Sequence, residues 1–104
     1  MTDPVATDLV NIVLMYARVG KSELLGEALG TLVALTSQEP GCAITELNQS
    51  ADDPNTWMVY ERWRGKDAFA SHMKQPYVTQ FLARMGDLVS KPAEVRPFKH
   101  YWRS

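Results

Sequence analysis

The sequence contains few of the features that mark a disulfide-bonded, membrane-spanning or nucleic-acid-binding protein. Its single cysteine, Cys42, excludes an intrachain disulfide and any zinc site built from several cysteines. No apolar run approaches the ~20 residues that a helix needs to cross a bilayer. The 11 basic side chains are interleaved with 12 acidic ones, so no basic stripe offers a footprint for a phosphate backbone. We therefore expect no membrane and no nucleic-acid partner.

The start of the chain, MTDPVATDLV, also lacks the positive charge and the long apolar core of a secretory signal. There are no repeats, low-complexity tracts or linkers, and 104 residues are close to the commonest domain size. The composition, 45% hydrophobic and 22% charged, is that of an ordinary globular domain. We expect one domain over residues 1–104, located in the cytoplasm.

The chain does contain a regular alternation of strand-like and helix-like segments. Residues 9–19 are rich in β-branched and aromatic side chains and predict a strand with two apolar faces. Residues 22–39 follow helical spacing, with Ser22 as a candidate N-cap and with Gly26 and Gly30 as points of close packing on a sheet. Residues 42–50 and 56–63 predict a hairpin around an Asp-Pro-Asn turn. Residues 66–90 predict a helix broken at Pro76, and residues 94–102 a last strand whose Pro97 suits a sheet edge.

This β-α-β-β-α-β order indicates an α+β, ferredoxin-like fold, in which an antiparallel four-stranded sheet carries both helices on one face. The face without helices is expected to leave apolar side chains of the first strand, among them Val13 and Met15, in water. An exposed apolar face usually marks an interface, and two such sheets packed back to back make a symmetric dimer. We therefore predict a homodimer through the sheet face.

Several motifs occur together in an informative order. They are EPGC at residues 39–42, the turn SADDPN at 50–55, YERW at 60–63 and AFASH at 68–72. This pattern resembles the antibiotic biosynthesis monooxygenase family of dimeric α+β barrel proteins, and a looser similarity extends over nearly the whole chain. Members of that family oxidise quinol-like or polycyclic aromatic substrates with O2, without flavin or metal. Others degrade haem or isomerise small molecules. The resemblance implies a pocket between the sheet and the helices of each subunit.

One strand and the helix after it supply a candidate site. Along the strand, Glu61 lies between two tryptophans of the same parity. The short loop at residues 64–66 folds the helix back over this strand, so His72 is expected to approach Glu61. A Glu–His pair fixes the imidazole tautomer and makes the histidine a better general base. In this hypothesis His72 is the base and Glu61 orients it. The pocket would be lined by Trp57, Trp63, Tyr77 and Phe81.

The resemblance and the pair together predict a cofactor-independent monooxygenase that acts on a small, quinol-like aromatic with O2. Removing a proton from a phenol or quinol gives an electron-rich anion that can transfer an electron to O2, and a polar group can stabilise the developing charge. No cofactor is expected. No metal is expected either, because His72 and His100 have no carboxylate cluster at ligand spacing.

Other interpretations stay open. An isomerase or lyase could use the same pair for proton transfer on a small hydroxy-carbonyl compound, and it would work without O2. A non-catalytic dimeric module could bind a small apolar ligand or a partner. A lone histidine on an apolar helical face is often only structural, and Glu61 has Arg62 and Arg64 as alternative partners. Cys42 is interpreted as a small hydrophobic side chain rather than as a nucleophile.

Overall fold

The computed structural model describes residues 4–104. The first three residues of the segment MTDPVATDLV lie outside the described residues. Within that range the elements follow the predicted order, with the last helical segment divided in two. The elements are β1 (Leu9–Tyr16), α1 (Ser22–Thr36), β2 (Cys42–Gln49), β3 (Thr56–Trp63), α2 (Lys66–His72), α3 (Pro76–Met85) and β4 (Glu94–Lys99).

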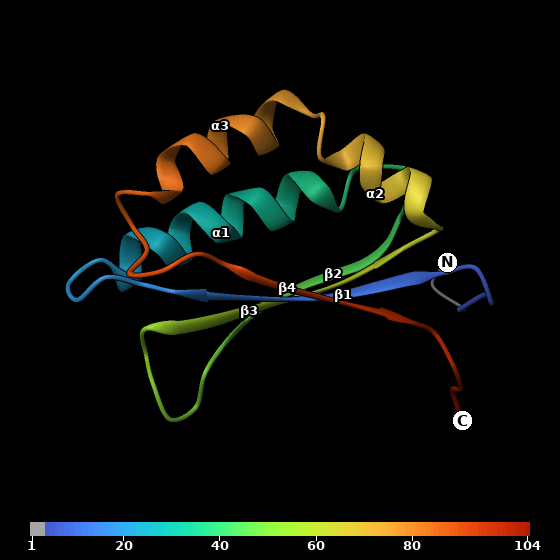
Figure 1. Ribbon diagram of the computed structural model, residues 1–104, viewed down its shortest axis with the longest axis horizontal. Helices are drawn as coiled ribbons and strands as arrows, with labels where there is room; N and C mark the ends of the chain where they lie inside the picture. The colour runs from blue at the N-terminus through green and yellow to red at the C-terminus, as the bar shows by residue number, and fades with distance from the viewer. Residues whose placement is uncertain (1–3) are drawn as a thin grey trace.

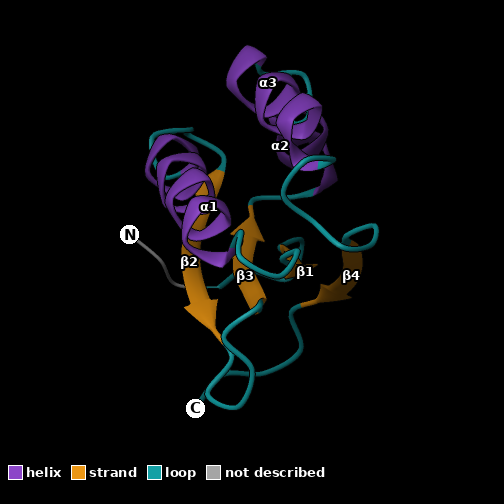
Figure 2. Cartoon of the chain, turned by 90° about the vertical axis from the view of Figure 1, so that its left-hand side faces the viewer, coloured by secondary structure: helices purple, strands orange, loops and turns teal. Residues whose placement is uncertain are grey.

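The strands form one antiparallel sheet in the order β2-β3-β1-β4. Figure 1 shows the helices on one side of this sheet, while the β2–β3 loop and the C-terminal segment extend on the other side. In the end view of Figure 2, α1 lies above the β2–β3 half of the sheet, and α2 and α3 lie above the β1–β4 half. The α+β, ferredoxin-like fold predicted from the sequence is confirmed.

The hydrophobic core fills the space between the sheet and the helices. Leu25 and Leu29 of α1 are completely buried, and they belong to one cluster with Met15 of β1 and Val59 of β3. Phe81 joins the same cluster from α3. Burying each such side chain contributes about 1.5–3 kcal/mol, so this cluster holds the helices against the sheet.

The two apolar faces of β1 are oriented opposite to the expectation. Met15 is buried in the core beneath the helices, and Val13 packs against the same cluster. The alternate residues Val10, Ile12 and Leu14 therefore point to the face without helices. The expectation that Val13 and Met15 would be in water is wrong, because a period of two shows which residues share a face but not which face is covered.

The start of α1 also differs from the prediction. Ser22 is the first helical residue rather than the N-cap, since Lys21 occupies the cap position. The Ser22 hydroxyl instead donates to the carbonyl of Pro54 and accepts a hydrogen bond from Nε1 of Trp57 at 3.0 Å. The Trp57 ring lies against Gly26, where a Cβ atom would come within 2.6 Å of it. Gly26 thus permits the close approach of α1 to β3. The same prediction is wrong for Gly30, where an added Cβ atom would have no neighbour within 4 Å.

The prolines and the hairpin turn lie where the sequence places them. Pro76 is in the first turn of α3, directly after the break between the two short helices. Pro97 lies in β4, an edge strand, where a missing N–H is tolerated. In the β2–β3 loop, the Asp53 carboxylate accepts hydrogen bonds from the backbone N–H of Asn55 at 3.0 Å and the hydroxyl of Thr56 at 2.8 Å. These bonds fix the turn that joins β2 to β3.

Candidate functional site

His72 is the last residue of α2, and the local sequence brings its side chain over β3. Gly65 makes the turn between the strand and the helix with φ at 113°, a conformation that residues with side chains rarely adopt. α2 then folds back along the strand, so that the imidazole lies against Trp63 with ring centroids 4.6 Å apart. Phe69 of the same helix lies 6.1 Å from the imidazole. His72 is therefore buried in aromatic surroundings.

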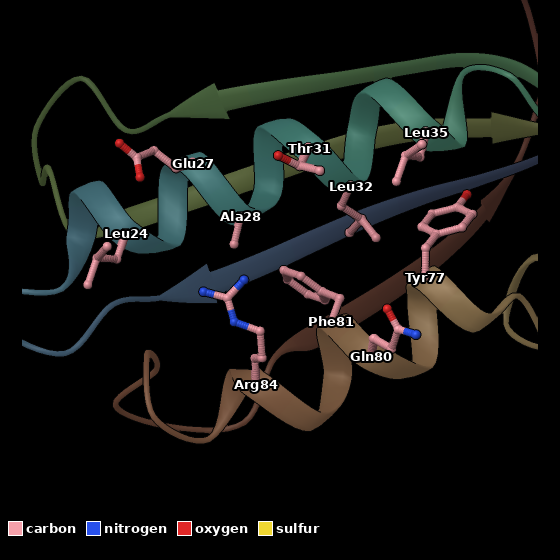
Figure 3. Close-up of a pocket in the computed structure, with 10 residues that line it drawn as sticks. All are labelled: Leu24, Glu27, Ala28, Thr31, Leu32, Leu35, Tyr77, Gln80, Phe81 and Arg84. Atoms are coloured by element: carbon pink, nitrogen blue, oxygen red, sulfur yellow. The ribbon is translucent and has the colours of Figure 1, made fainter.

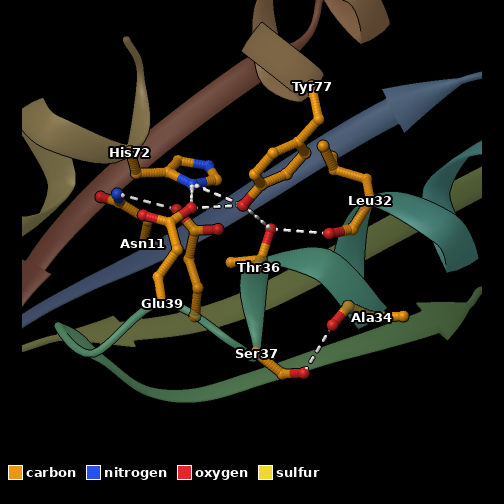
Figure 4. A network of polar contacts seen from close by, with 9 residues as sticks. Asn11, Leu32, Ala34, Thr36, Ser37, Glu39, His72 and Tyr77 are labelled. Carbon is orange, nitrogen blue, oxygen red and sulfur yellow. Dashed lines mark hydrogen bonds and ion pairs between the residues drawn. The ribbon is translucent and has the colours of Figure 1, made fainter. Parts of the chain in front are cut away.

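One nitrogen of this histidine is bonded to a carboxylate (Figure 4). Nδ1 of His72 lies 2.7 Å from Oε2 of Glu39, which belongs to the turn after α1. Tyr77, in the first turn of α3, donates its hydroxyl to the same oxygen and lies 3.2 Å from Oγ1 of Thr36. The side chains of His72 and Glu39 are only 6% and 13% exposed. Because they are so nearly buried, dissolved salt screens their interaction weakly.

This hydrogen bond fixes the tautomer of neutral His72. An ionised carboxylate only accepts hydrogen bonds, so Nδ1 carries the proton. The lone pair then lies on Nε2, which has no hydrogen-bond partner within residues 4–104. An imidazole held in this way at one nitrogen presents the other as a general base.

Two groups near Glu39, Tyr77 and Cys42, have raised pKa values. Burial, together with the hydrogen bond to Glu39, raises the pKa of Tyr77 to about 12. Burial, and then the negative charges of Glu61 and Glu39, raises the pKa of Cys42 to about 11. Near pH 7 Tyr77 is therefore a hydrogen-bond donor, and Cys42 is a neutral thiol with little nucleophilic character.

His72 and Glu61 line one inner cavity between the helices and the sheet. Its volume is ≈ 120 Å³, and every other lining residue within the described chain is apolar. Glu61 is buried on β3, where its Oε1 accepts a hydrogen bond of 3.2 Å from Nδ2 of Asn11 on the neighbouring β1. The inner cavity therefore combines an apolar wall with two polar groups, one of which is a candidate base.

A second hollow, the outer groove, lies between α1 and α3 (Figure 3). Its volume is ≈ 380 Å³, and its lining includes the charged side chains of Glu27 and Arg84. Leu32 and Phe81 line both the outer groove and the inner cavity, so they form the wall between the two. No histidine is among the residues of 4–104 that line the groove. The inner cavity is therefore the better candidate for proton-transfer chemistry.

Most of the residues proposed from the sequence gather near the inner cavity. His72, Glu61 and Phe81 line the cavity. Trp63 packs against the imidazole of His72, and Tyr77 lines the outer groove and donates a hydrogen bond to Glu39. Trp57 does not join them. It lies at the other end of β3 and lines a surface hollow beside the start of α1.

The partner predicted for the histidine is different in the structure. We expected Glu61 to orient the imidazole, but Nδ1 of His72 is bonded to Glu39, and the carboxylate of Glu61 accepts from Asn11. The reason is that α1 ends at Thr36 rather than at Glu39, which frees Glu39 to reach the end of α2 from the turn. Two signals in the sequence could have shown this. They are Asn11 in the middle of an apolar strand and the carboxylate of Glu39 in the EPGC motif.

The part of the chain that the structure describes has neither a metal-binding cluster nor a membrane-spanning helix. Among the described residues, no group of three or more His, Cys, Asp or Glu side chains is placed to hold a metal ion. No helix in residues 4–104 is long and apolar enough to cross a membrane.

The fold and the site define a class of small α+β proteins with a ferredoxin-like sheet, helices on one face and a cavity between the two layers. The family model described as "Antibiotic biosynthesis monooxygenase" matches residues 9–84. The chain therefore belongs to the antibiotic biosynthesis monooxygenase family, as its motifs predict.

Comparisons with individual proteins agree with this membership. The chain is 30% identical to "Putative monooxygenase Rv0793" of Mycobacterium tuberculosis over 95 residues, which are 91% of this chain and 89% of that protein. The structure of Rv0793 superposes with a TM-score of 0.87 at 24% identity and covers 93% of this chain and 98% of the other. A Synechocystis relative, "Uncharacterized protein sll1783", is 30% identical over 69 residues, 66% of this chain but only 47% of that protein. This chain thus spans about half the length of the Synechocystis protein.

One solved structure belongs to a protein described as a cofactor-independent oxygenase, SnoaB from Streptomyces nogalater. Its TM-score is 0.82 at 17% identity, and the match covers 94% of this chain and 97% of SnoaB. At this identity the comparison shows that the fold is shared.

Proposed function

We propose that this chain is a monooxygenase that oxidises a small phenolic or quinol-like aromatic with O2 and needs no cofactor. Membership of the antibiotic biosynthesis monooxygenase family supports the reaction class. The fold shared with SnoaB, described as a cofactor-independent oxygenase, supports the absence of a cofactor. The observation that carries the proposal is His72, held at Nδ1 by Glu39 and lining a cavity whose other side chains are apolar except for Glu61.

In this proposal Nε2 of His72 takes the proton from the substrate hydroxyl. The imidazolium that forms is stabilised by Glu39 at 2.7 Å, and Tyr77 keeps the carboxylate in place by donating to the same oxygen. A low-dielectric surrounding strengthens this ion pair relative to one in water. The ion pair with Glu39 thus favours transfer of the proton from the substrate to His72.

The phenolate is the reductant. It transfers electrons to O2, a new carbon–oxygen bond forms at a ring carbon that bears hydrogen, and the oxygen–oxygen bond then breaks. The ring gains one oxygen atom and loses two hydrogens, and these leave with the second oxygen atom as water. All four electrons that reduce O2 come from the substrate, so the step needs no external reductant. The apolar wall of the cavity keeps bulk water from the reacting ring.

Other residues in the cavity and beside the imidazole have supporting roles in the proposal. Phe81 contributes an aromatic wall against which a flat ring can stack. Glu61, which accepts a hydrogen bond from Asn11, places a second polar group beside the substrate ring. Trp63 packs on the imidazole and restricts its rotation.

Oxygen uptake with a panel of phenols and hydroquinones tests the function. We expect O2 consumption that saturates with substrate, one atom of ¹⁸O₂ in the product and no turnover under argon. Product formation at an undiminished rate without O2 would contradict the oxygenase and favour the isomerase or lyase. Absence of turnover, with binding retained, would favour a non-catalytic ligand-binding module.

We also propose that the sheet face without helices is a homodimer interface. The face carries Val10, Ile12 and Leu14 of the central strand β1, and Phe98 of β4 on the same face is 54% exposed. An apolar face of this kind is usually covered in the functional assembly. Sedimentation at micromolar concentration should give a species of twice the 11.7 kDa chain mass. A single 11.7 kDa species at that concentration, with Phe98→Glu unchanged in behaviour, would exclude the dimer.

A further inference from the structure

We infer that the substrate of the inner cavity is a single-ring phenol with an uncharged alkyl tail, and that the tail leaves through an apolar opening between α2, α3 and β4. This substrate class rests on the proposed oxygenase function, which by itself requires only a small aromatic. Three properties of the inner cavity carry the inference: its volume, the position of its polar groups and the character of its opening.

The volume fits one aromatic ring. The inner cavity measures ≈ 120 Å³, and an apolar cavity of about 150 Å³ in another protein binds benzene. On the side of the outer groove, a fused second ring would have to displace Leu32 or Phe81, which separate the two spaces. Phe81 is buried in the core cluster, and closely packed side chains of this kind do not yield freely.

The polar groups lie at one end of the cavity. Glu61 is two residues before Trp63 on the same face of β3, and Trp63 contacts His72. The remaining lining residues within 4–104 are apolar. A substrate hydroxyl at the His72 end can therefore form hydrogen bonds. A polar substituent elsewhere on the ring would lose its hydration without gaining a hydrogen bond.

The opening is apolar as well. Met73, Leu82 and Val95 line the cavity and are still 41%, 43% and 53% exposed, so they lie where the cavity meets solvent. They come from the end of α2, from α3 and from β4. A hydrocarbon chain that passes these side chains stays in apolar contact. A carboxylate in the same place meets no cationic side chain among the lining residues of the described chain.

Binding under argon tests the inference without any turnover. Three ligands that each carry one aromatic hydroxyl are compared. They are 4-propylphenol, 3-(4-hydroxyphenyl)propanoate, which has a charged tail, and 6-propyl-2-naphthol, which has a second ring. By isothermal titration we expect 4-propylphenol to bind at least tenfold more tightly than either of the others. Equal or tighter binding of the naphthol would overturn the single-ring claim. Equal or tighter binding of the propanoate would overturn the apolar opening, and no saturable binding of 4-propylphenol would overturn both.

A charge placed at the opening gives a second test. Leu82→Lys changes an exposed position, so the fold should be retained, and it should shift the ratio of propanoate to propylphenol affinity by at least tenfold towards the propanoate. Gln80→Lys is the matched control, because Gln80 is exposed on the same helix but lines the outer groove. An equal shift in both variants would contradict the proposed opening. If 4-propylphenol binds as expected but no O2 is consumed in air, the oxygenase fails while the ligand class stands.

Discussion

Replacement of Glu39 by glutamine tests the pair that holds His72. The substitution keeps the length of the side chain and leaves an amide oxygen that can accept from Nδ1 and from the Tyr77 hydroxyl. It removes the negative charge and replaces the second carboxylate oxygen by an amide N–H₂ group. Hydrogen bonds to charged groups contribute about 1.5–3 kcal/mol and neutral ones about 1 kcal/mol. Because the pair is nearly buried, we expect the imidazolium to lose about 1–2 kcal/mol of stabilisation. That corresponds to a fall in kcat of about tenfold, with KM nearly unchanged.

Glu39→Ala should cost much more, because it frees Tyr77. The tyrosine hydroxyl lies 3.4 Å from Nδ1 of His72, and without the carboxylate it can donate to that nitrogen. The imidazole proton would then move to Nε2, and the base would be lost. In a serine protease a comparable wrong tautomer lowers kcat by about 10⁴-fold. A second substitution, Tyr77→Phe, should restore part of the activity of Glu39→Ala.

The assays are O2 uptake with 4-propylphenol and ¹⁵N NMR of the imidazole. We expect the NMR spectrum of the wild type to show the proton of neutral His72 on Nδ1, and that of Glu39→Ala to show it on Nε2. Glu27→Gln, exposed on α1, is the control and should change neither. A Glu39→Gln variant with a lower melting temperature but wild-type kcat would refute the reasoning, because the pair would then be structural only.

Four further predictions concern stability and reactivity. The pKa of Tyr77 is raised by burial from 10.0 to about 12. The stability that this neutral hydroxyl contributes is therefore complete below pH 10 and is lost as the pH rises to about 12. Urea midpoints at pH 9 and 11.5 should differ less in Tyr77→Phe than in the wild type. The pKa of Cys42 is raised from 9.0 to about 11, so at pH 7.5 iodoacetamide should alkylate the native thiol about a hundredfold more slowly than the urea-unfolded one; equal rates would contradict this. Gly26→Ala places a Cβ atom 2.6 Å from the Trp57 ring and should destabilise the fold by about 1–3 kcal/mol. In Gly30→Ala the new Cβ has no neighbour within 4 Å, and the substitution should stabilise by up to about 1 kcal/mol in thermal melts.

The fold could be predicted because its signals are local. The period-two pattern of residues 56–63, the helical spacing after Ser22, and the prolines at the helix break and the sheet edge each describe a short segment. The order of those segments then allows few topologies. The covered face of β1 could not be predicted in the same way, since both sets of alternating side chains are apolar and only tertiary packing distinguishes them.

The candidate site could be predicted only in part. The sequence placed His72 over β3 because a short glycine-containing loop leaves the helix little choice of path. It did not identify Glu39 as the partner, since that contact joins residues 33 positions apart and depends on where α1 ends. A helix boundary is the least certain feature of a sequence-based prediction, and here a shift of three residues decides which carboxylate holds the imidazole.

The role of His72 as the general base is tested by measuring O2 uptake by His72→Gln and His100→Gln with one phenolic substrate. His100 is the second histidine of the chain; it follows β4 and does not line the inner cavity. We predict a wild-type rate for His100→Gln. For His72→Gln we predict a loss of about 10²–10⁴-fold in kcat, the usual contribution of a general base. A folded His72→Gln variant with wild-type kcat would contradict the claim that His72 is the base.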